Sequence, residues 1–147
     1  MGILFGTNTS HNLDRYDEGT WVPNFRSING GTMSYTTNMN DGRYVRIGNM
    51  VTLSFKGVQS HSGTNGPVIF GPLPYTPQNY NGSQQFSCCM TDNMDSGSSA
   101  AFWGIYVSQN NATGYLYYIT KNQGWTYQET GHDNNFGIIG SITYECV

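Results

Sequence analysis

The sequence has little charge, and the charges that it has are scattered. Charged residues make up 10% of the 147 positions, lysine and arginine together number 6, and the formal net charge is −3. Lys56 and Lys121 are isolated, and Arg43 and Arg46 form one close pair. Electrostatic binding to nucleic acid needs lysine and arginine clustered on one surface. We therefore expect no nucleic-acid partner.

Long apolar runs and a disulfide framework are also missing. No run approaches the roughly 20 apolar residues of a transmembrane helix. The opening MGILFG is too short for a secretory signal and has no basic residue. Cys88 and Cys89 are adjacent, a pair that rarely bonds to itself, and Cys146 leaves the number odd. We expect no membrane span, synthesis in a reducing cytoplasm, and at least one thiol of the adjacent pair buried as a small apolar side chain.

Strong helix formers are scarce, whereas glycine, with 19 residues, and tyrosine, with 11, are abundant. This composition favours strands and turns. The clearest prediction is a hairpin over residues 44–58 with a two-residue turn at Gly48–Asn49, because glycine adopts positive φ without steric cost. After the turn, apolar Val51, Leu53 and Phe55 alternate with polar residues. Period two predicts one buried face and one wet face.

Further short strands are predicted at turn spacings near ten residues. Residues 20–25 read as a short strand broken by Pro23, and therefore as a strand at a sheet edge. Prolines 72, 74 and 77 predict an extended corner after a strand at residues 68–70. The remaining strands are expected at 86–90, 100–108, 115–120 and 136–147, with loops at 59–67 and 121–135.

About eight to ten short strands indicate an all-β fold. We expect a β-sandwich of jelly-roll type with an extended N-terminal arm, and a barrel is the alternative. The arm covers residues 1–18 and opens with an apolar hook, Ile3, Leu4 and Phe5. Residues 19–147 form the single domain.

No combination of residues predicts a catalytic or metal site. The three histidines, His11, His61 and His132, are far apart and lack metal-ligand spacing. Cys88, His132 and Asp133 could be proposed as a catalytic triad, but many small proteins contain residues that would allow the same proposal. We expect no enzyme activity, no metal and no cofactor.

Two carboxylate pairs have simpler interpretations than glycosidase chemistry. Asp92 and Asp95 lie in a turn rich in glycine and serine, where aspartate caps its own backbone. Asp17 and Glu18 follow Arg15, which offers an ion pair. Trp125 and Tyr127 are different, because they lie in a polar segment without apolar neighbours. They are the candidate ligand-facing aromatics, since exposed aromatic rings suit sugar faces and protein contacts.

Four segments of the chain together resemble a known family. They are YDEGTWVP (residues 16–23), GRYVRIGNMV (42–51), GPLPY (71–75) and the terminal segment 136–144. In this order they are similar to a domain of tailed-bacteriophage virion proteins, often found at the C-terminal end of tail fibres. The resemblance covers residues 13–147. It implies a jelly-roll-like fold, frequent trimerisation, a place on the virion surface after synthesis in the bacterial cytoplasm, and no catalytic residues.

A trimer on a particle would give the opening segment a role. Ile3, Leu4 and Phe5 would be the virion-attachment arm. Four of the fifteen charged residues lie close together at the end of the arm, namely Asp14, Arg15, Asp17 and Glu18. They would fix the register of the arm, because charges specify orientation more than they add affinity. Trp21 would anchor the first strand.

The resemblance leaves two functions open. A methionine stands about 15 residues before the domain, which leaves room for an arm and a head and favours a trimeric capsid decoration (cement) protein or a short accessory spike. Its partners would be sister copies and other virion proteins. The alternative is a tail-fibre tip that binds a host receptor or surface glycan. A secreted sugar-binding module is disfavoured by the missing export signal.

Overall fold

The computed structural model describes nine stretches of the chain, residues 15–28, 32–35, 41–62, 67–79, 85–92, 100–108, 111–120, 125–127 and 135–147. Within them all regular structure is β-strand. The strands are β1 (Tyr16–Trp21), β2 (Asn24–Ser27), β3 (Thr32–Tyr35), β4 (Asp41–Ile47), β5 (Met50–Ser62), β6 (Val68–Gly71), β7 (Gln85–Asp92), β8 (Ala100–Val107), β9 (Gly114–Thr120), β10 (Trp125–Tyr127) and β11 (Asn135–Glu145). The all-β prediction is confirmed.

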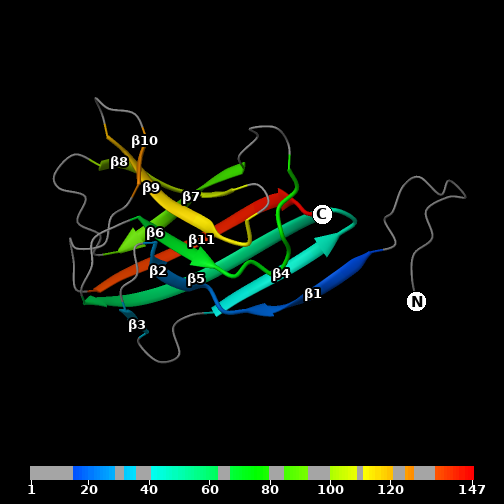
Figure 1. The fold of residues 1–147 in the computed structure, drawn as a ribbon, viewed down its shortest axis with the longest axis horizontal. Coiled ribbons are helices and arrows are strands. Elements are labelled where there is room, and N and C mark those ends of the chain that lie inside the picture. Colours follow the sequence, from blue (N-terminus) through cyan, green and yellow to red (C-terminus); the bar gives the residue numbers. More distant parts are fainter. Residues whose placement is uncertain are drawn as a thin grey trace, which may run out of the picture.

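The strands form one curled antiparallel sheet in the order β1-β4-β5-β11-β7-β8-β9-β6-β2 (Figure 1). Strand β3 pairs with β5, and β10 pairs with β9. Strand β7 connects the two halves, since residues 89–92 pair with β11 and residues 85–88 pair with β8. Strands β1 and β2 are the two ends of this order, although only Val22 and Pro23 separate them in the chain. The predicted break at Pro23 and the edge position are therefore confirmed.

The predicted hairpin is formed by β4 and β5, with Ile47 paired to Met50. Gly48 in its turn has φ of 59°, a left-handed conformation that favours glycine. The predicted proline-rich corner is confirmed as well, because residues 72–79 contain no strand, and an isolated bridge joins Pro77 to Cys146. We call residues 72–79 the corner segment.

Three segments differ from the prediction. Strand β5 continues through Ser62, inside the predicted loop 59–67, because β11 pairs with it as far as Ser60 and β3 pairs with it from Gln59 to Ser62. Strand β3 itself was not predicted. Residues 125–127, expected in a loop, form β10 against Tyr117–Ile119, since Trp, Thr and Tyr all favour strands. In addition β1 begins at Tyr16, so the expected boundary of the arm at residue 18 falls within a strand.

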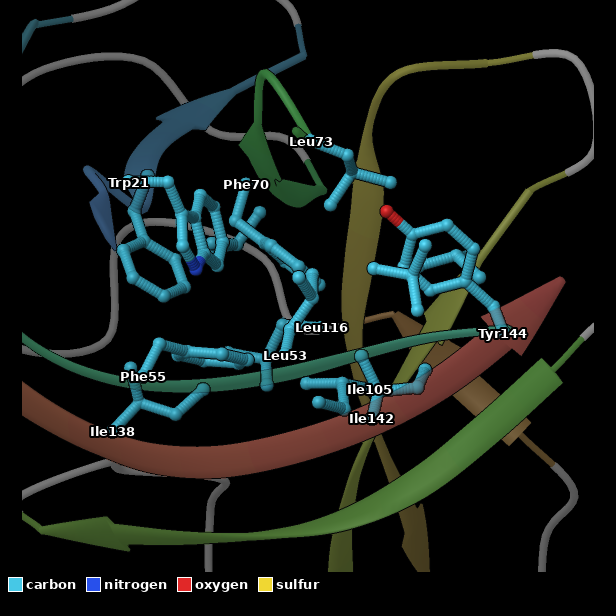
Figure 2. Close-up of a cluster of buried hydrophobic side chains, with 14 of the residues drawn as sticks. Trp21, Leu53, Phe55, Phe70, Leu73, Ile105, Leu116, Ile138, Ile142 and Tyr144 are labelled. Atoms are coloured by element: carbon cyan, nitrogen blue, oxygen red, sulfur yellow. The ribbon is translucent and has the colours of Figure 1, made fainter. Parts of the chain in front are cut away.

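The core lies inside the curl and is rich in aromatic rings (Figure 2). Phe55 is central to it: its ring centroid lies 5.3 Å from that of Phe70, 6.1 Å from Phe25 and 5.8 Å from Trp21. Phe25 and Phe70 come from the half of the sheet that contains β2 and β6, and Phe55 from the other half. The aromatic core therefore joins the two halves face to face.

The cysteines are free thiols, with Cys88 exposed, Cys89 half-buried and Cys146 buried. Burial raises the pKa of the Cys89 thiol to about 12. Cys89 also packs against the hydrophobic core, so the more buried thiol of the adjacent pair is half-buried and not fully buried as expected.

Candidate functional site

A cluster of polar and aromatic side chains lies where the first strand, the hairpin, the corner segment and the last strand meet. It consists of Asp17 on β1, Tyr44 and Arg46 on β4, Tyr75 in the corner segment, and Tyr144 on β11, and we call it the Asp17 cluster. Each of the four segments singled out in the sequence, residues 16–23, 42–51, 71–75 and 136–144, contributes a side chain to it. It is therefore the best candidate for a functional site within the described residues.

Strand register places the β1 and β4 members on the inner face of the sheet. Asp17 pairs with Arg46, and Gly19 pairs with Tyr44. Because paired residues of neighbouring strands share a face, these side chains point the same way as buried Trp21. Gly19 makes room for the tyrosine ring, since a Cβ at that position would lie 2.8 Å from the ring of Tyr44. Tyr44 can thus reach across β1.

One carboxylate oxygen accepts two phenol hydroxyls. The Tyr44 hydroxyl donates to Asp17 Oδ2 at 3.3 Å, and the Tyr75 hydroxyl donates to the same oxygen. The two tyrosine rings meet edge to face with centroids 5.7 Å apart. Hydrogen bonds to a charged acceptor are stronger than neutral ones. Asp17 therefore links the edge strand to the corner segment, 58 residues away in the chain.

Arg46 is a buried cation beneath this pair, with only 8% of its surface exposed. Its Nε donates to the Gly48 carbonyl at 2.8 Å, and its guanidinium carbon lies 4.4 Å from the centre of the Tyr75 ring. A cation over an aromatic face gains about 0.5–2 kcal/mol. Its Nη2 is buried and has no hydrogen-bond partner within the described residues. Arg46 thus supports Tyr75 from the hairpin turn.

The tyrosine hydroxyls of the cluster remain protonated donors at neutral pH. The hydrogen bond to Asp17 is the main cause that raises the pKa of Tyr75. Burial, followed by the charge of Asp17, raises the pKa of Tyr44. Burial also raises the pKa of Tyr144, whose hydroxyl donates to the Tyr75 carbonyl at 2.8 Å. Through these hydroxyl donors and the shared acceptor Asp17, the cluster can hold β1, β4, the corner segment and β11 in register.

Backbone hydrogen bonds fix the corner segment on both flanks. Gln78 N donates to Glu145 O at 2.7 Å, and Val147 N donates to Thr76 O at 3.2 Å. On the other flank Leu73 N donates to Ala112 O at 2.8 Å. The corner segment therefore spans the open side of the curl, between β1 and the half-sheet of β6 and β9.

A groove of about 520 Å³ opens beside the cluster, between β1 and the start of the corner segment. Its walls come from Thr20, Trp21, Val22, Asn24, Tyr44, Pro72, Leu73 and Pro74. Trp21, the predicted anchor of the first strand, is 9% exposed and meets Phe55 edge to face. Its Nε1 is buried without a hydrogen-bond partner in the described structure. The groove is thus lined mainly by apolar and aromatic side chains.

The four charges predicted to fix the arm do not act as one group in the described structure. Asp17 joins the cluster, whereas Glu18 lies on the opposite face of β1 and accepts the Tyr16 hydroxyl. Arg15 is exposed, and its carbonyl accepts from Gly48 N at 2.8 Å. Asp14 lies outside the described residues. Because Asp17 and Glu18 diverge, they do not form a convergent carboxylate pair.

Several other predicted residues also lie outside the described structure, namely Ile3, Leu4, Phe5, His11, Asp95, His132 and Asp133. For Trp125, Tyr127 and His61 only the backbone is described: the two aromatics belong to β10, and His61 belongs to β5. Among described residues, no group of three or more His, Cys, Asp or Glu side chains could hold a metal ion. No helix in the described chain is long and apolar enough to span a membrane.

Sequence reasoning missed four members of the cluster, Tyr44, Arg46, Tyr75 and Tyr144, as site residues. For Arg46, the alternation of inward-facing and outward-facing residues along the hairpin could have indicated its position. Arg46 shares the parity of Tyr44 and pairs with Val51, so it had to face inward. A cation on a buried face needs a partner, and that requirement could have directed attention to this end of the sheet.

Comparisons with known proteins yielded no relative: no protein-family model, no curated protein and no solved structure matches the chain.

Proposed function

We propose that the protein is a structural component on the exterior of a tailed-bacteriophage particle, as a homotrimeric capsid decoration protein or short accessory spike. The observation that carries the proposal is the convergence at the Asp17 cluster. The four segments that resemble the phage domain are dispersed over residues 16–144, and each places a side chain in this one cluster. Because the four segments meet at one cluster, we interpret them as parts of one motif and not as separate chance similarities.

We further infer that the curled sheet is a β-sandwich of jelly-roll type with an N-terminal arm. Two half-sheets that share β7 and enclose one aromatic core support this reading. The arm, with Ile3, Leu4 and Phe5, would attach to the particle. A decoration protein that bridges neighbouring subunits stabilises the shell, because expansion or rupture must break the added contacts.

The test is to purify particles from the infected host and locate the protein on them. Quantitative mass spectrometry gives its copy number, and cryo-electron microscopy gives its position. A decoration protein should be present in about hundreds of copies arranged with the symmetry of the shell. Absence of the protein from purified particles would overturn the proposal.

The alternative, a tail-fibre tip that binds a host glycan, rests on Trp125 and Tyr127 in β10. It predicts at most about a few dozen copies at the tail, and glycan binding that Trp125→Ala and Tyr127→Ala abolish. A copy number in the hundreds together with no glycan binding would exclude this alternative.

A further inference from the structure

The outer face of β1, β4, β5, β11 and residues 89–92 of β7 exposes an unusual number of apolar side chains. The described residues include ten exposed large apolar or aromatic side chains, and six of them lie on this face. They are Tyr16 (63% exposed), Val45 (38%), Ile47 (48%), Met50 (46%), Met90 (75%) and Ile139 (53%). Scattered surface apolar residues are ordinary, but a concentration on one face marks an interaction surface.

Register confirms that these residues share one face. Tyr16 pairs with Ile47, and Ile47 pairs with Met50, which puts three of them in one row across β1, β4 and β5. Ile139 pairs with Met90 at the diagonally opposite corner. The inner residues between these positions, such as Val51 and Leu53, are fully buried. The six side chains therefore point away from the core.

The middle of the face, on β5 and β11, is polar. Thr52 and Thr143 pair across β5 and β11, with 2.9 Å between their hydroxyl oxygens, and Ser54 pairs with Ser141. Among the side chains that the structure describes, charges on the face are of both signs: Glu18, Asp41 and Glu145 against Arg43 and Lys56. Such a surface neither repels a second copy of itself nor favours a strongly basic or acidic partner.

We propose that this face packs against a second copy of the chain. Five strands about 4.8 Å apart, each with about seven residues at about 3.4 Å, make a face of roughly 600 Å². Covered by an equal area of a neighbouring copy, as between successive subunits of a trimer, it would bury roughly 1,200 Å² in total, the lower end of stable specific interfaces. The inference deepens the self-association in the proposed function by naming its surface, and its test needs no particle.

The test compares two isoleucines of equal exposure. Ile47 on the face and Ile28 elsewhere are 48% and 47% exposed. Sedimentation velocity over a concentration series should show wild-type oligomers, Ile47→Lys should weaken association by about tenfold or more, and Ile28→Lys should leave it unchanged. Ile139→Lys, at the other corner, should repeat the loss. Near-ultraviolet circular dichroism verifies that each variant is folded.

Two results would overturn the proposal: a wild-type protein that stays monomeric up to millimolar concentration, or equal association of the Ile47→Lys and Ile28→Lys variants. Hydroxyl-radical labelling is an independent readout, in which Met50 and Met90 should become protected as concentration rises. Because purified protein alone is used, a monomer found abundantly on particles would refute this interface while leaving the virion assignment intact.

Discussion

The two sides of the curled sheet are closed by different interactions. On the β7 side the backbone ladder is continuous, because one strand pairs with β11 through residues 89–92 and with β8 through residues 85–88. On the β1 side the ladder ends, since β1 pairs only with β4 among the described residues. There the corner segment and the Asp17 cluster span the opening. The β7 side is thus closed by a main-chain ladder, whereas β1 contacts the corner segment through side chains.

The difference explains why charge is concentrated near the first strand of a chain that has little of it. An edge strand exposes unpaired backbone groups, and charged side chains there discourage pairing with other chains. Asp17 and Glu18 occupy such an edge. Asp17 has in addition become the acceptor that holds the corner segment. Main-chain ladders tolerate most substitutions, whereas the link from β1 to the corner segment runs through the carboxylate of Asp17.

The largest effect is expected from a change that weakens both sides at once. Phe70 is fully buried between the half-sheets and contacts Phe25 and Phe55. Phe70→Ala should reduce the free energy of unfolding by about 3–5 kcal/mol through lost burial and a cavity, measured by denaturant unfolding. Phe86, 54% exposed, is the matched control, and Phe86→Ala should cost less than about 1 kcal/mol. Equal losses would contradict the assigned core.

A smaller effect, confined to the β1 side, is expected from Asp17→Ala. Removal of the shared acceptor should cost about 1–2 kcal/mol, because charged hydrogen bonds contribute about 1.5–3 kcal/mol and partial exposure to solvent weakens them. Amide hydrogen exchange should accelerate in residues 72–79 and remain unchanged in the β5–β11 ladder. Glu18→Ala, next to it on the opposite face, is the control. Uniform acceleration in both regions would refute the distinction between the two sides.

The smallest effect concerns high pH. Phenols whose pKa is raised in the folded protein keep protons that the unfolded chain releases, so stability is full below pH 10 and falls as pH rises above it. Burial raises the pKa of Tyr117, near the β7 side, to about 12, and Asp17 raises that of Tyr75 on the β1 side. Tyr75→Phe should therefore flatten the decline of unfolding free energy between pH 9 and 11. An unchanged slope would show that Tyr75 titrates as in the unfolded chain.

Local patterns were sufficient to predict most strands. The hairpin at Gly48–Asn49, the break at Pro23 and the proline-rich corner each follow from one or two residues with restricted backbone geometry. The extension of β5 through Ser62 was missed, because Gln59 and Ser60 are held by pairing with β3 and β11, and Ser62 by pairing with β3, and not by their own preference. Tertiary context overrode local propensity there.

The candidate site was less accessible to sequence reasoning. Asp17 and Trp21 were singled out, but Tyr75 approaches Asp17 from 58 residues away, and no spacing rule links them. Which strands become neighbours depends on the global topology, which periodicity alone does not determine. The divergence of Asp17 and Glu18, by contrast, follows from simple alternation within a strand.

The Gly48–Asn49 turn forms hydrogen bonds with both ends of the described chain. Gly48 N donates to the Arg15 carbonyl at 2.8 Å, and Cys146 N donates to Asn49 O at 2.8 Å. The entry of β1 and the exit of β11 therefore lie at the same pole of the molecule (Figure 1). A linker of a few residues could join Arg15 to Val147, and new ends could be opened at the opposite pole. The chain is thus suited to circular permutation. A permuted chain would keep the contacts between strands while changing their order in the sequence, and it would therefore separate the contributions of the two to folding.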